Sequence, residues 1–363
     1  MKKNDLVIVI IFIVFLFIPN IAYWFIKDKM DNNNYENRNL YTKPEFSFKN
    51  ITEFPKNYEN YYNDNLSFKN EIRKIRANVN YKFGISSSER VIVGKNGWLF
   101  YNSIAAESVS SISDYRKTTK YKLEEKEKIK DSLLNTRDNL KENDIEFYIL
   151  VAPNKENVYS DYLESKIGRS NAKFSRIEDL VNYLRKNTDL ELIYPKDVLV
   201  NNRKIENTYY KYDTHWNYYG GYLGTIELMK NIDSEFEIPK IRLEKMEYAG
   251  DLANMNLTSK LTNKEPIVKG FYDDIKFSCE EKPEFKYCNS NDPIYDKTIL
   301  FVGDSFRNAT IQYLAKLYKN SIFVHRDYFD KKIINDYNID IVVYEVVERY
   351  SDSLYNTEII FNK

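Results

Sequence analysis

The chain has 363 residues, of which 43% are hydrophobic and 30% are charged, a composition typical of a globular protein with one large α/β domain and additions. Lys plus Arg and Asp plus Glu are equal at 54 each, which argues against a nucleic-acid-binding protein, because such proteins carry a basic excess. We attribute the 32 Tyr residues to a genome-composition bias, with sugar-stacking surfaces as the alternative.

The N-terminal segment predicts a membrane anchor. Leu6–Ile26 is almost entirely apolar, and about 20 apolar residues cross a bilayer as a helix. Tyr23 and Trp24 lie at its outer end, where aromatic rings favour the membrane interface. No small-residue cleavage site follows, which favours an uncleaved signal anchor over a removed signal peptide. We therefore expect a single-pass protein of the cell membrane, with residues 1–5 cytoplasmic and the chain after the anchor extracytoplasmic.

The segments after the anchor predict a tether and the start of a domain that spans residues 51–363. Residues 27–50 are polar and Asn-rich, which is typical of a flexible tether. Residues 51–82 place apolar side chains at helical spacing between charges. Val91–Val93 and residues 98–101 flank a Gly-rich turn and predict a hairpin.

From residue 120 onward, helical patterns alternate with short apolar runs. The expected helices are 120–143, 177–185, 218–229 and 310–317. The expected strands are 145–151, 190–194, 298–302, 321–325 and 339–344, with 333–338 as a connecting segment. This alternation is typical of an α/β fold.

Residues 235–292 predict irregular or β-rich structure and contain both cysteines of the chain. Cys279 and Cys288 frame a short hairpin or loop, and in an oxidising compartment they would form a disulfide across it. Two unpaired thiols are the alternative. No His/Cys/Asp cluster has metal-ligand spacing, and no Gly-rich phosphate loop occurs, so we expect no metal and no cofactor.

Ser305 is the candidate nucleophile. An apolar strand leads into Gly303-Asp304-Ser305, and a helix follows. A serine at such a turn points its hydroxyl past the carboxyl end of the sheet, and backbone N–H groups at the helix start can bind an oxyanion. Gly-Asp-Ser is also common turn chemistry, so the motif by itself is a weak signal.

His215 is the candidate base, with Asp213 as the acid that orients it. Residues i and i+2 of an extended segment project from the same face, so the carboxylate of Asp213 can reach the imidazole. The alternative is a helix N-cap at Asp213 or Thr214 beside a packed or surface histidine. His325, the other histidine, has no such partner, and we expect a structural role for it.

Three further residues are candidates for substrate binding. Trp216 adjoins the candidate base and is a candidate for the pocket wall or a sugar contact, with packing as the alternative. Glu345 and Arg349 follow the last strand at the sheet edge expected to hold Ser305. A solvated, charged start of a helix is the alternative for both.

Four segments in this order resemble the SGNH-hydrolase-like alginate O-acetyltransferase family of the AlgJ and AlgX type. They are Gly94–Tyr101, Asp213–Trp216, Gly250–Ala253 and Gly303–Phe306, and the resemblance covers roughly residues 37–350. It implies a flavodoxin-type α/β/α sandwich with permuted catalytic blocks and a triad of Ser305, His215 and Asp213. The Gly and Asn oxyanion blocks of SGNH enzymes have no clean match here.

The resemblance implies acetyl or other acyl transfer onto an exported polysaccharide through an acyl-Ser305 intermediate, with a multi-span membrane-bound O-acyltransferase as donor. If water replaces the sugar hydroxyl, the same site is a carbohydrate esterase. A non-catalytic glycan-binding scaffold subunit is the competing class. A membrane-anchored structural protein of the cell-division type is a third, but it leaves the coincidence of Asp213, His215 and Ser305 unexplained.

Overall fold

The computed structural model describes residues 3–31, 33, 39–104 and 111–362, and the chain divides into two compact units, Met1–Phe83 and Gly84–Lys363. The first unit consists of helices α1 (Lys3–Ile26), α2 (Phe54–Asp64) and α3 (Lys69–Lys82), with a short 3₁₀ turn at Lys27–Lys29. Tether positions 32 and 34–38 and the N-terminal residues 1–2 lie outside the described residues.

None of the helices in the described part of the chain combines the length and the apolarity needed to span a membrane. The anchor at residues 6–26 therefore stays a prediction. The helical pattern of residues 51–82 is confirmed as two helices, α2 and α3.

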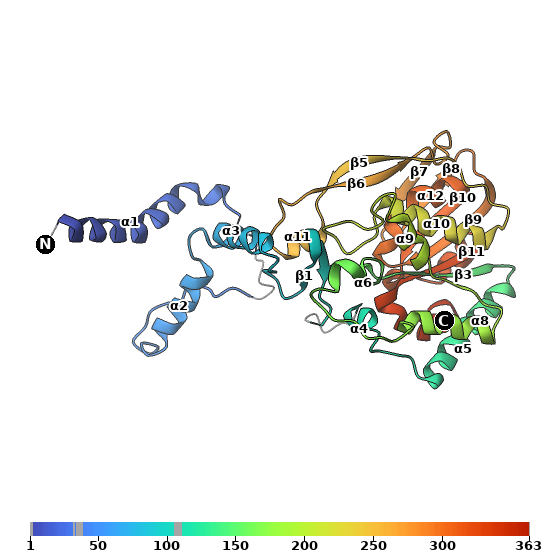
Figure 1. Cartoon of the computed structure of the whole chain (residues 1–363), viewed down its shortest axis with the longest axis horizontal. Helices are drawn as coiled ribbons and strands as arrows, with labels where there is room; N and C mark the ends of the chain where they lie inside the picture. The colour runs from blue at the N-terminus through green and yellow to red at the C-terminus, as the bar shows by residue number, and fades with distance from the viewer. Residues whose placement is uncertain (1–2, 32, 34–38, 105–110, 363) are drawn as a thin grey trace. The chain divides into compact units, whose positions relative to one another are not determined.

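A seven-stranded sheet forms the centre of the second unit (Figure 1). In spatial order its strands are β4 (Leu192–Ile193), β3 (Glu146–Ala152), β11 (Ile341–Val347), β9 (Tyr295–Gly303), β10 (Tyr318–His325), β8 (Phe285–Ser290) and β7 (Phe277–Glu281). The first five are parallel, and β8 and β7 complete the sheet as an antiparallel hairpin. All five parallel strands were predicted from their apolar runs, and β4 is shorter than expected.

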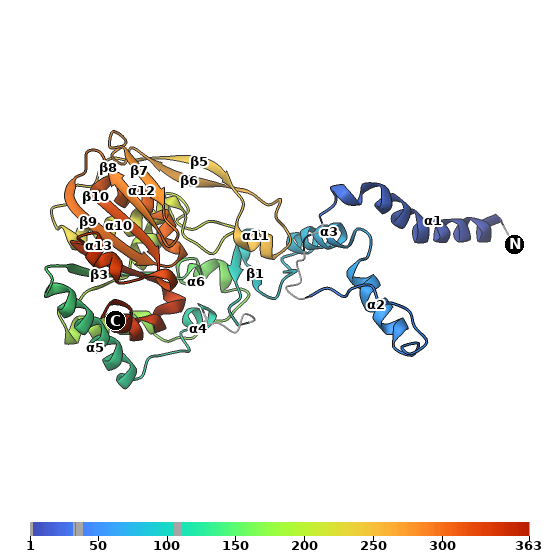
Figure 2. The ribbon, with the colours of Figure 1, turned by 180° about the vertical axis from the view of Figure 1, so that it is seen from behind.

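Helices cover both faces of this sheet, because successive side chains of a strand point to opposite faces. In β9, Ile299 and Phe301 pack into one core while Leu300 and Val302 pack into the other. Figures 1 and 2 show the two helical layers on either side of the sheet. One layer holds α9 (Lys196–Asn202), α10 (Tyr218–Ile232) and α12 (Ile311–Leu317); the other holds α5 (Leu123–Lys141), α8 (Arg176–Asn187), α13 (Lys332–Asp336) and α14 (Thr357–Asn362). The predicted α/β/α architecture is confirmed, and residues 333–338 include helix α13 where only a connecting segment was expected.

Smaller elements surround the sheet. The predicted hairpin is confirmed as β1 (Val91–Val93) paired with β2 (Leu99–Tyr101), and a second hairpin joins β5 (Arg242–Tyr248) to β6 (Asn263–Lys269). The short helices are α4 (Ser111–Arg116), α6 (Lys155–Val158), α7 (Ser160–Leu163) and α11 (Asp251–Met255).

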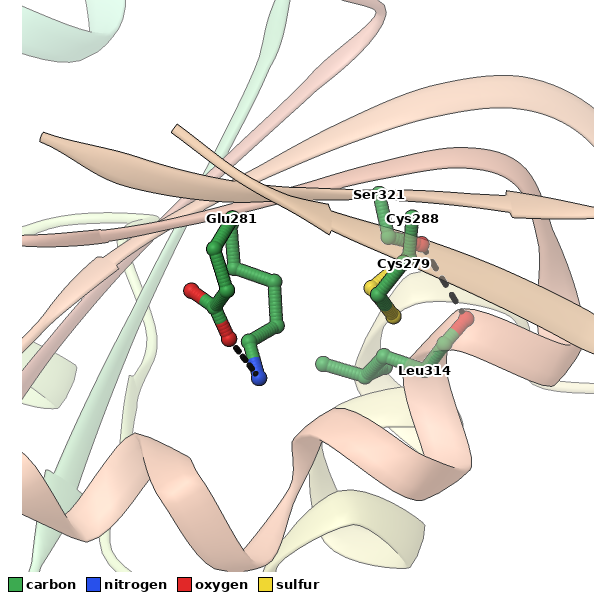
Figure 3. Close-up of a disulfide and its surroundings, with 6 residues drawn as sticks. Cys279, Glu281, Cys288, Leu314 and Ser321 are labelled. Atoms are coloured by element: carbon green, nitrogen blue, oxygen red, sulfur yellow. Dashed lines mark hydrogen bonds and ion pairs between the residues drawn. A yellow bond between two sulfur atoms is a disulfide. The ribbon is translucent and has the colours of Figure 1, made fainter. Parts of the chain in front are cut away.

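Cys279 and Cys288 form a disulfide across the β7–β8 hairpin, as expected for an oxidising compartment (Figure 3). The two residues lie directly opposite each other in the strand register, with their Cα atoms 4.1 Å apart. Cys288 is fully buried, and Ser321 of the neighbouring strand lies beside it with its hydroxyl bonded to the carbonyl of Leu314. The disulfide therefore fastens the edge strand β7 to β8, while the separate hydrogen bond from Ser321 joins β10 to α12.

Candidate active site

Ser305 lies in the turn that follows strand β9, at the carboxyl edge of the parallel strands. The side chain of Asp304 fixes this turn: one oxygen accepts the N–H of Phe306 at 3.0 Å, and the other accepts the N–H of Val347 at 2.7 Å. A 3₁₀ helix, Ser305–Ala309, begins directly at the serine, and the Ser305 side chain is exposed. The sequence pattern of an apolar strand, a turn and a helix thus places the hydroxyl where it was expected.

The buried side chain of Glu345 supports this turn from the protein interior. It is fully buried, and its carboxyl oxygen accepts the N–H of Asp304 at 3.0 Å. A Cβ at Gly303 would overlap the Glu345 side chain, so only glycine allows this close approach. Burial, followed by the charge of Asp304, raises the pKa of Glu345 well above its ordinary value and thereby favours its neutral form. Glu345 does not face the pocket, and its position suits support of the nucleophile rather than contact with a substrate.

His215 lies between Ser305 and Asp213 in a continuous chain of hydrogen bonds. Its Nε2 is 2.7 Å from the Ser305 hydroxyl, and its Nδ1 is 2.6 Å from a carboxylate oxygen of Asp213. A backbone bridge between Tyr209 and Trp216 closes a loop in which residues 211–215 are bent and not extended as expected. Asp213 still reaches the ring because its carboxylate also accepts the backbone N–H of His215 at 3.0 Å. The structure therefore brings the three predicted residues together, with His215 between Ser305 and Asp213.

Asp213 is held as a carboxylate. Its first oxygen accepts both the ring and the backbone N–H of His215, and its second accepts the backbone N–H of Asp251 at 3.0 Å and the hydroxyl of Tyr248 at 3.2 Å. Burial raises its pKa, but the hydrogen bond and the charge of His215 outweigh burial and lower the pKa to about 2. An ionised Asp213 fixes the tautomer of His215 that carries its proton on Nδ1 and leaves Nε2 free to accept the serine proton.

Two residues at the site had no role assigned from the sequence. Asp251 accepts the backbone N–H and the hydroxyl of Thr214 at 2.9 and 2.8 Å, and thereby grips the residue between Asp213 and His215. Its neighbour Gly250 packs so closely that a Cβ there would overlap the carbonyl of Tyr212. The Gly-Asp pair at positions 250–251 was the available signal, but nothing in the sequence shows which segment it approaches.

Lys155 is the second residue without a predicted role. It is almost fully buried, and its ammonium donates to the carbonyls of Leu99, Lys211 and Asp213 at 2.7, 3.0 and 2.8 Å. Burial lowers its pKa to about 8, although the charge of Asp213 opposes that shift. The Lys155 ammonium therefore joins the β1–β2 hairpin to the loop that contains His215. A lysine directly after a buried strand gives no sequence signal for such a contact.

The other two candidates for substrate binding are mainly packed. Trp216 contributes to the floor of the pocket but is only 1% exposed, and its indole N–H donates to the carbonyl of Phe306 at 2.8 Å. Arg349 is 9% exposed and places its guanidinium over the ring of Phe306. Both side chains hold Phe306, the residue that follows the nucleophile.

A pocket of about 240 Å³ opens in front of the triad. Tyr210, Tyr218 and Tyr248 form part of its wall, and Asn308 lies on the same side as Ser305. Tyr210 and Tyr248 stack with their ring centroids 3.9 Å apart. The pocket therefore offers flat aromatic surfaces and hydrogen-bonding groups beside an exposed serine hydroxyl.

Asp213, His215 and Asp251 also lie close enough for one ligand atom from each to fall within 4.8 Å of the others. Their polar atoms are already engaged, however, because Asp213 bonds His215 and both oxygens of Asp251 accept from Thr214. The arrangement is that of a hydrogen-bonded proton relay rather than that of a set of open metal ligands.

Comparison with known proteins agrees with this geometry. Residues 91–321 match the protein family described as "SGNH hydrolase-like domain, acetyltransferase AlgX". A sequence search of curated proteins gave no significant match.

Among solved structures, Bacillus cereus PatB1 is similar at 18% identity, with a TM-score of 0.50 over 73% of this chain and 98% of that one. PatB1 with a sulfonyl adduct is similar at 18% identity, with a TM-score of 0.51 over 75% and 99%. The O-acetyltransferase domain of Pseudomonas putida AlgJ is 15% identical, with a TM-score of 0.45 over 74% and 99%. At these identities the PatB1 structures support the fold.

Proposed function

This chain belongs to the family of SGNH hydrolase-like domains typified by the acetyltransferase AlgX, and we propose that it transfers an acyl group, most simply acetyl, to an exported polysaccharide through Ser305. The observation that carries the proposal is the hydrogen-bonded chain of Ser305, His215 and Asp213, with distances of 2.7 and 2.6 Å. Nucleophile, base and orienting acid in this arrangement are what acyl transfer through a serine requires.

In the first step, His215 Nε2 takes the proton of Ser305 while the hydroxyl oxygen attacks the carbonyl carbon of the acyl donor. The imidazolium is stabilised by the carboxylate of Asp213, which keeps its charge because its pKa is lowered to about 2. The N–H groups of Phe306 and Arg307 already bond to Asp304, so the N–H of Ser305 is the backbone donor left for the oxyanion. His215 then protonates the leaving group, and acyl-Ser305 remains.

In the second step, a sugar hydroxyl gives its proton to His215 and attacks the acyl carbon. The Ser305 oxygen leaves and regains the proton from His215, which restores the free enzyme. The tyrosines of the pocket wall support a pyranose acceptor, since flat aromatic faces pack against sugar rings. Water that enters the same open pocket would make the enzyme a carbohydrate esterase, and the exposed Ser305 favours this second activity in the absence of acceptor.

We further propose that α1 anchors the chain in the cell membrane, with the second unit outside the cytoplasm. The exposed apolar side chains of α1, such as Leu6, Phe15 and Phe25, support the anchor, and the disulfide supports an oxidising compartment. A multi-span membrane-bound O-acyltransferase would then supply the acyl group across the membrane. A non-catalytic scaffold would not need a base oriented toward an exposed serine.

Hydrolysis of p-nitrophenyl acetate by the full-length chain tests the proposal, with Ser305→Ala and His215→Ala as the decisive variants. We expect both to lose turnover by about a thousandfold or more. The matched control is His325→Ala, which removes the other histidine of the chain and should keep wild-type activity. Hydrolysis at the wild-type rate in Ser305→Ala would exclude the serine mechanism.

A further inference from the structure

Helix α3 of the first unit exposes a stripe of large apolar side chains. Ile72, Ile75, Val79 and Phe83 are each between 49% and 76% exposed, and their spacing of three and four residues places them on one face of the helix. An uninterrupted apolar stripe of this length is removed from water only when another surface packs against it.

Basic residues border this stripe. The sequence Lys69–Lys82 contains five basic residues and one acidic residue, Glu71. At 100° per residue, Arg76 falls on one side of the stripe and Lys82 on the other. Lys74 forms an ion pair with Asp31 on another side of the helix, so the positive charge is not confined to the stripe border. Glu71 falls on the same side as Lys82, so the exposed face combines an apolar centre with edges where two basic residues outnumber one acidic residue.

The unit that contains α3 has almost no core of its own. Among the described residues of Met1–Phe83, Ala77 is the single buried hydrophobic residue, whereas apolar side chains are exposed along α1, α2 and α3. A segment of this size stays ordered in water only by burying apolar surface. The covering surface must therefore come from outside this unit.

We propose that α3 lies along the surface of an anionic membrane, with Ile72, Ile75 and Val79 in the boundary between headgroups and acyl chains. Arg76 and Lys82 would then extend toward lipid phosphates, as the cationic borders of interfacial helices do. Anionic lipid is favoured over a protein partner because it matches both parts of the face, the apolar stripe and the positive border.

The test uses the full-length chain with a fluorophore at Ile75→Cys, which is practical because the two native cysteines are disulfide-bonded to each other. The fluorophore reports the polarity of its surroundings, and brominated lipids report its depth. In vesicles of phosphatidylcholine with phosphatidylglycerol, we expect a blue shift and quenching. Both signals should weaken when the anionic lipid is omitted or when Arg76→Glu and Lys82→Glu are introduced.

The same fluorophore at Lys128→Cys, an exposed position of α5 in the second unit, is the matched control and should stay in water. Turnover of p-nitrophenyl acetate should be unchanged in every labelled protein. A label at position 75 that stays aqueous in all vesicles would overturn the proposal. A label already shielded before lipid is added would also overturn it, because a protein surface would then cover the stripe.

A separate observation concerns Asp251, whose carboxylate grips Thr214 through the backbone N–H at 2.9 Å and the hydroxyl at 2.8 Å. Its own backbone N–H donates to Asp213 at 3.0 Å, and its carboxylate lies 4.0 Å from Nδ1 of His215. Asp251 thus contacts both residues that directly precede the base, Asp213 and Thr214.

We infer that Asp251 is a positioning residue that fixes the loop from Asp213 to His215 and so keeps the imidazole directed at Ser305. This inference rests on the proposed function. The groups that face His215 are Asp213, Asp251, Ser305 and the hydroxyl of Thr214, with Tyr248 and Lys155 one bond further away on Asp213.

The experiment compares kcat and KM separately for Asp251→Asn, Asp251→Ala and the wild type, with Ser305→Ala as reference. Asp251→Asn keeps one carbonyl oxygen that can accept a hydrogen bond from Thr214, so kcat should fall severalfold with little change in KM. Asp251→Ala loses both hydrogen bonds to Thr214, so kcat should fall tenfold or more with little change in KM. If Ser305→Ala is inactive but both Asp251 variants match the wild type, only this inference fails. If Ser305→Ala is active, the proposed function fails and this inference fails with it.

Discussion

The two units of the chain differ most in where they place apolar and polar side chains. In the second unit, Gly84–Lys363, apolar residues fill two cores on either side of the sheet, and buried charged groups such as Asp213 and Lys155 have partners within the unit. In the described part of the first unit, the large apolar residues face outward and only Ala77 is buried among the hydrophobic residues. The second unit is completed by its own residues, whereas the first must be completed by something outside itself.

Removal of the first unit should have the largest effect and tests this difference between the units. A fragment that begins at Gly84 should keep its cooperative thermal unfolding and its esterase activity within about twofold, because both cores lie entirely in the second unit. The fragment should lose association with vesicles completely in a flotation assay. A fragment that aggregates or unfolds non-cooperatively would show that the second unit depends on residues before 84.

The substitution Lys155→Met tests how much the stability of the second unit depends on a buried charged group. The substitution removes the shared donor of the carbonyls of Leu99, Lys211 and Asp213. The Lys211 carbonyl still accepts the backbone N–H of Leu99, so the cost of about 1–3 kcal/mol for a buried group left unpaired applies to Leu99 and Asp213. We expect a loss of at least about 2 kcal/mol in the free energy of unfolding, measured with urea.

Lys128→Met, at an exposed position of α5, is the matched control and should change stability by less than about 0.5 kcal/mol. Equal stability of the two variants would show that the buried ammonium is dispensable.

Glu345 distinguishes support from substrate binding. The raised pKa of Glu345 favours its neutral form, which the uncharged Gln resembles in shape, so Glu345→Gln should change both stability and activity little. Glu345→Ala leaves the N–H of Asp304 unpaired beside a cavity and should cost about 2–4 kcal/mol. A Glu345→Gln variant with wild-type stability but a much higher KM would instead place Glu345 in contact with substrate.

The smallest expected effect is the pH dependence contributed by Asp213. Its folded-state pKa of about 2 lies below the unfolded value of 3.8, so the stabilisation is complete above pH 3.8 and is lost as the pH falls toward 2. The shift corresponds to about 2 kcal/mol. Unfolding free energies of the wild type and Asp213→Asn should therefore converge between pH 4 and pH 2. A constant difference over that range would contradict the assignment.

The sheet of the second unit could be predicted because its parallel strands are buried on both faces and appear as continuous apolar runs, such as Ile341–Tyr344. The β5–β6 hairpin was not located, because β5 is largely exposed and Arg242–Tyr248 shows no clear alternation of apolar and polar residues. Asp213 and His215 were paired correctly from their spacing of two, but the expected extended segment is wrong: residues 213–215 are bent, and the carboxylate reaches both the backbone and the ring N–H of His215.

The roles of Glu345, Asp251 and Lys155 could not be predicted, since each depends on a segment far away in the sequence. Glu345 was expected after the last strand at the exposed sheet edge, but it lies within β11, where the turn at Gly303 covers it. Asp251 reaches its partners only because Gly250 allows close approach to Tyr212. Such contacts are set by the packing of loops, which local patterns do not encode.

The most direct test of the central claim is the intact mass of the full-length chain after brief incubation with p-nitrophenyl acetate. The account predicts one added acetyl group, mapped by peptide analysis to Ser305, that disappears when an oligosaccharide acceptor is supplied. It also predicts no adduct in Ser305→Ala or His215→Ala and an unchanged adduct in His325→Ala. Acetyl groups on other residues, or an adduct that persists in Ser305→Ala, would contradict acyl transfer through this serine.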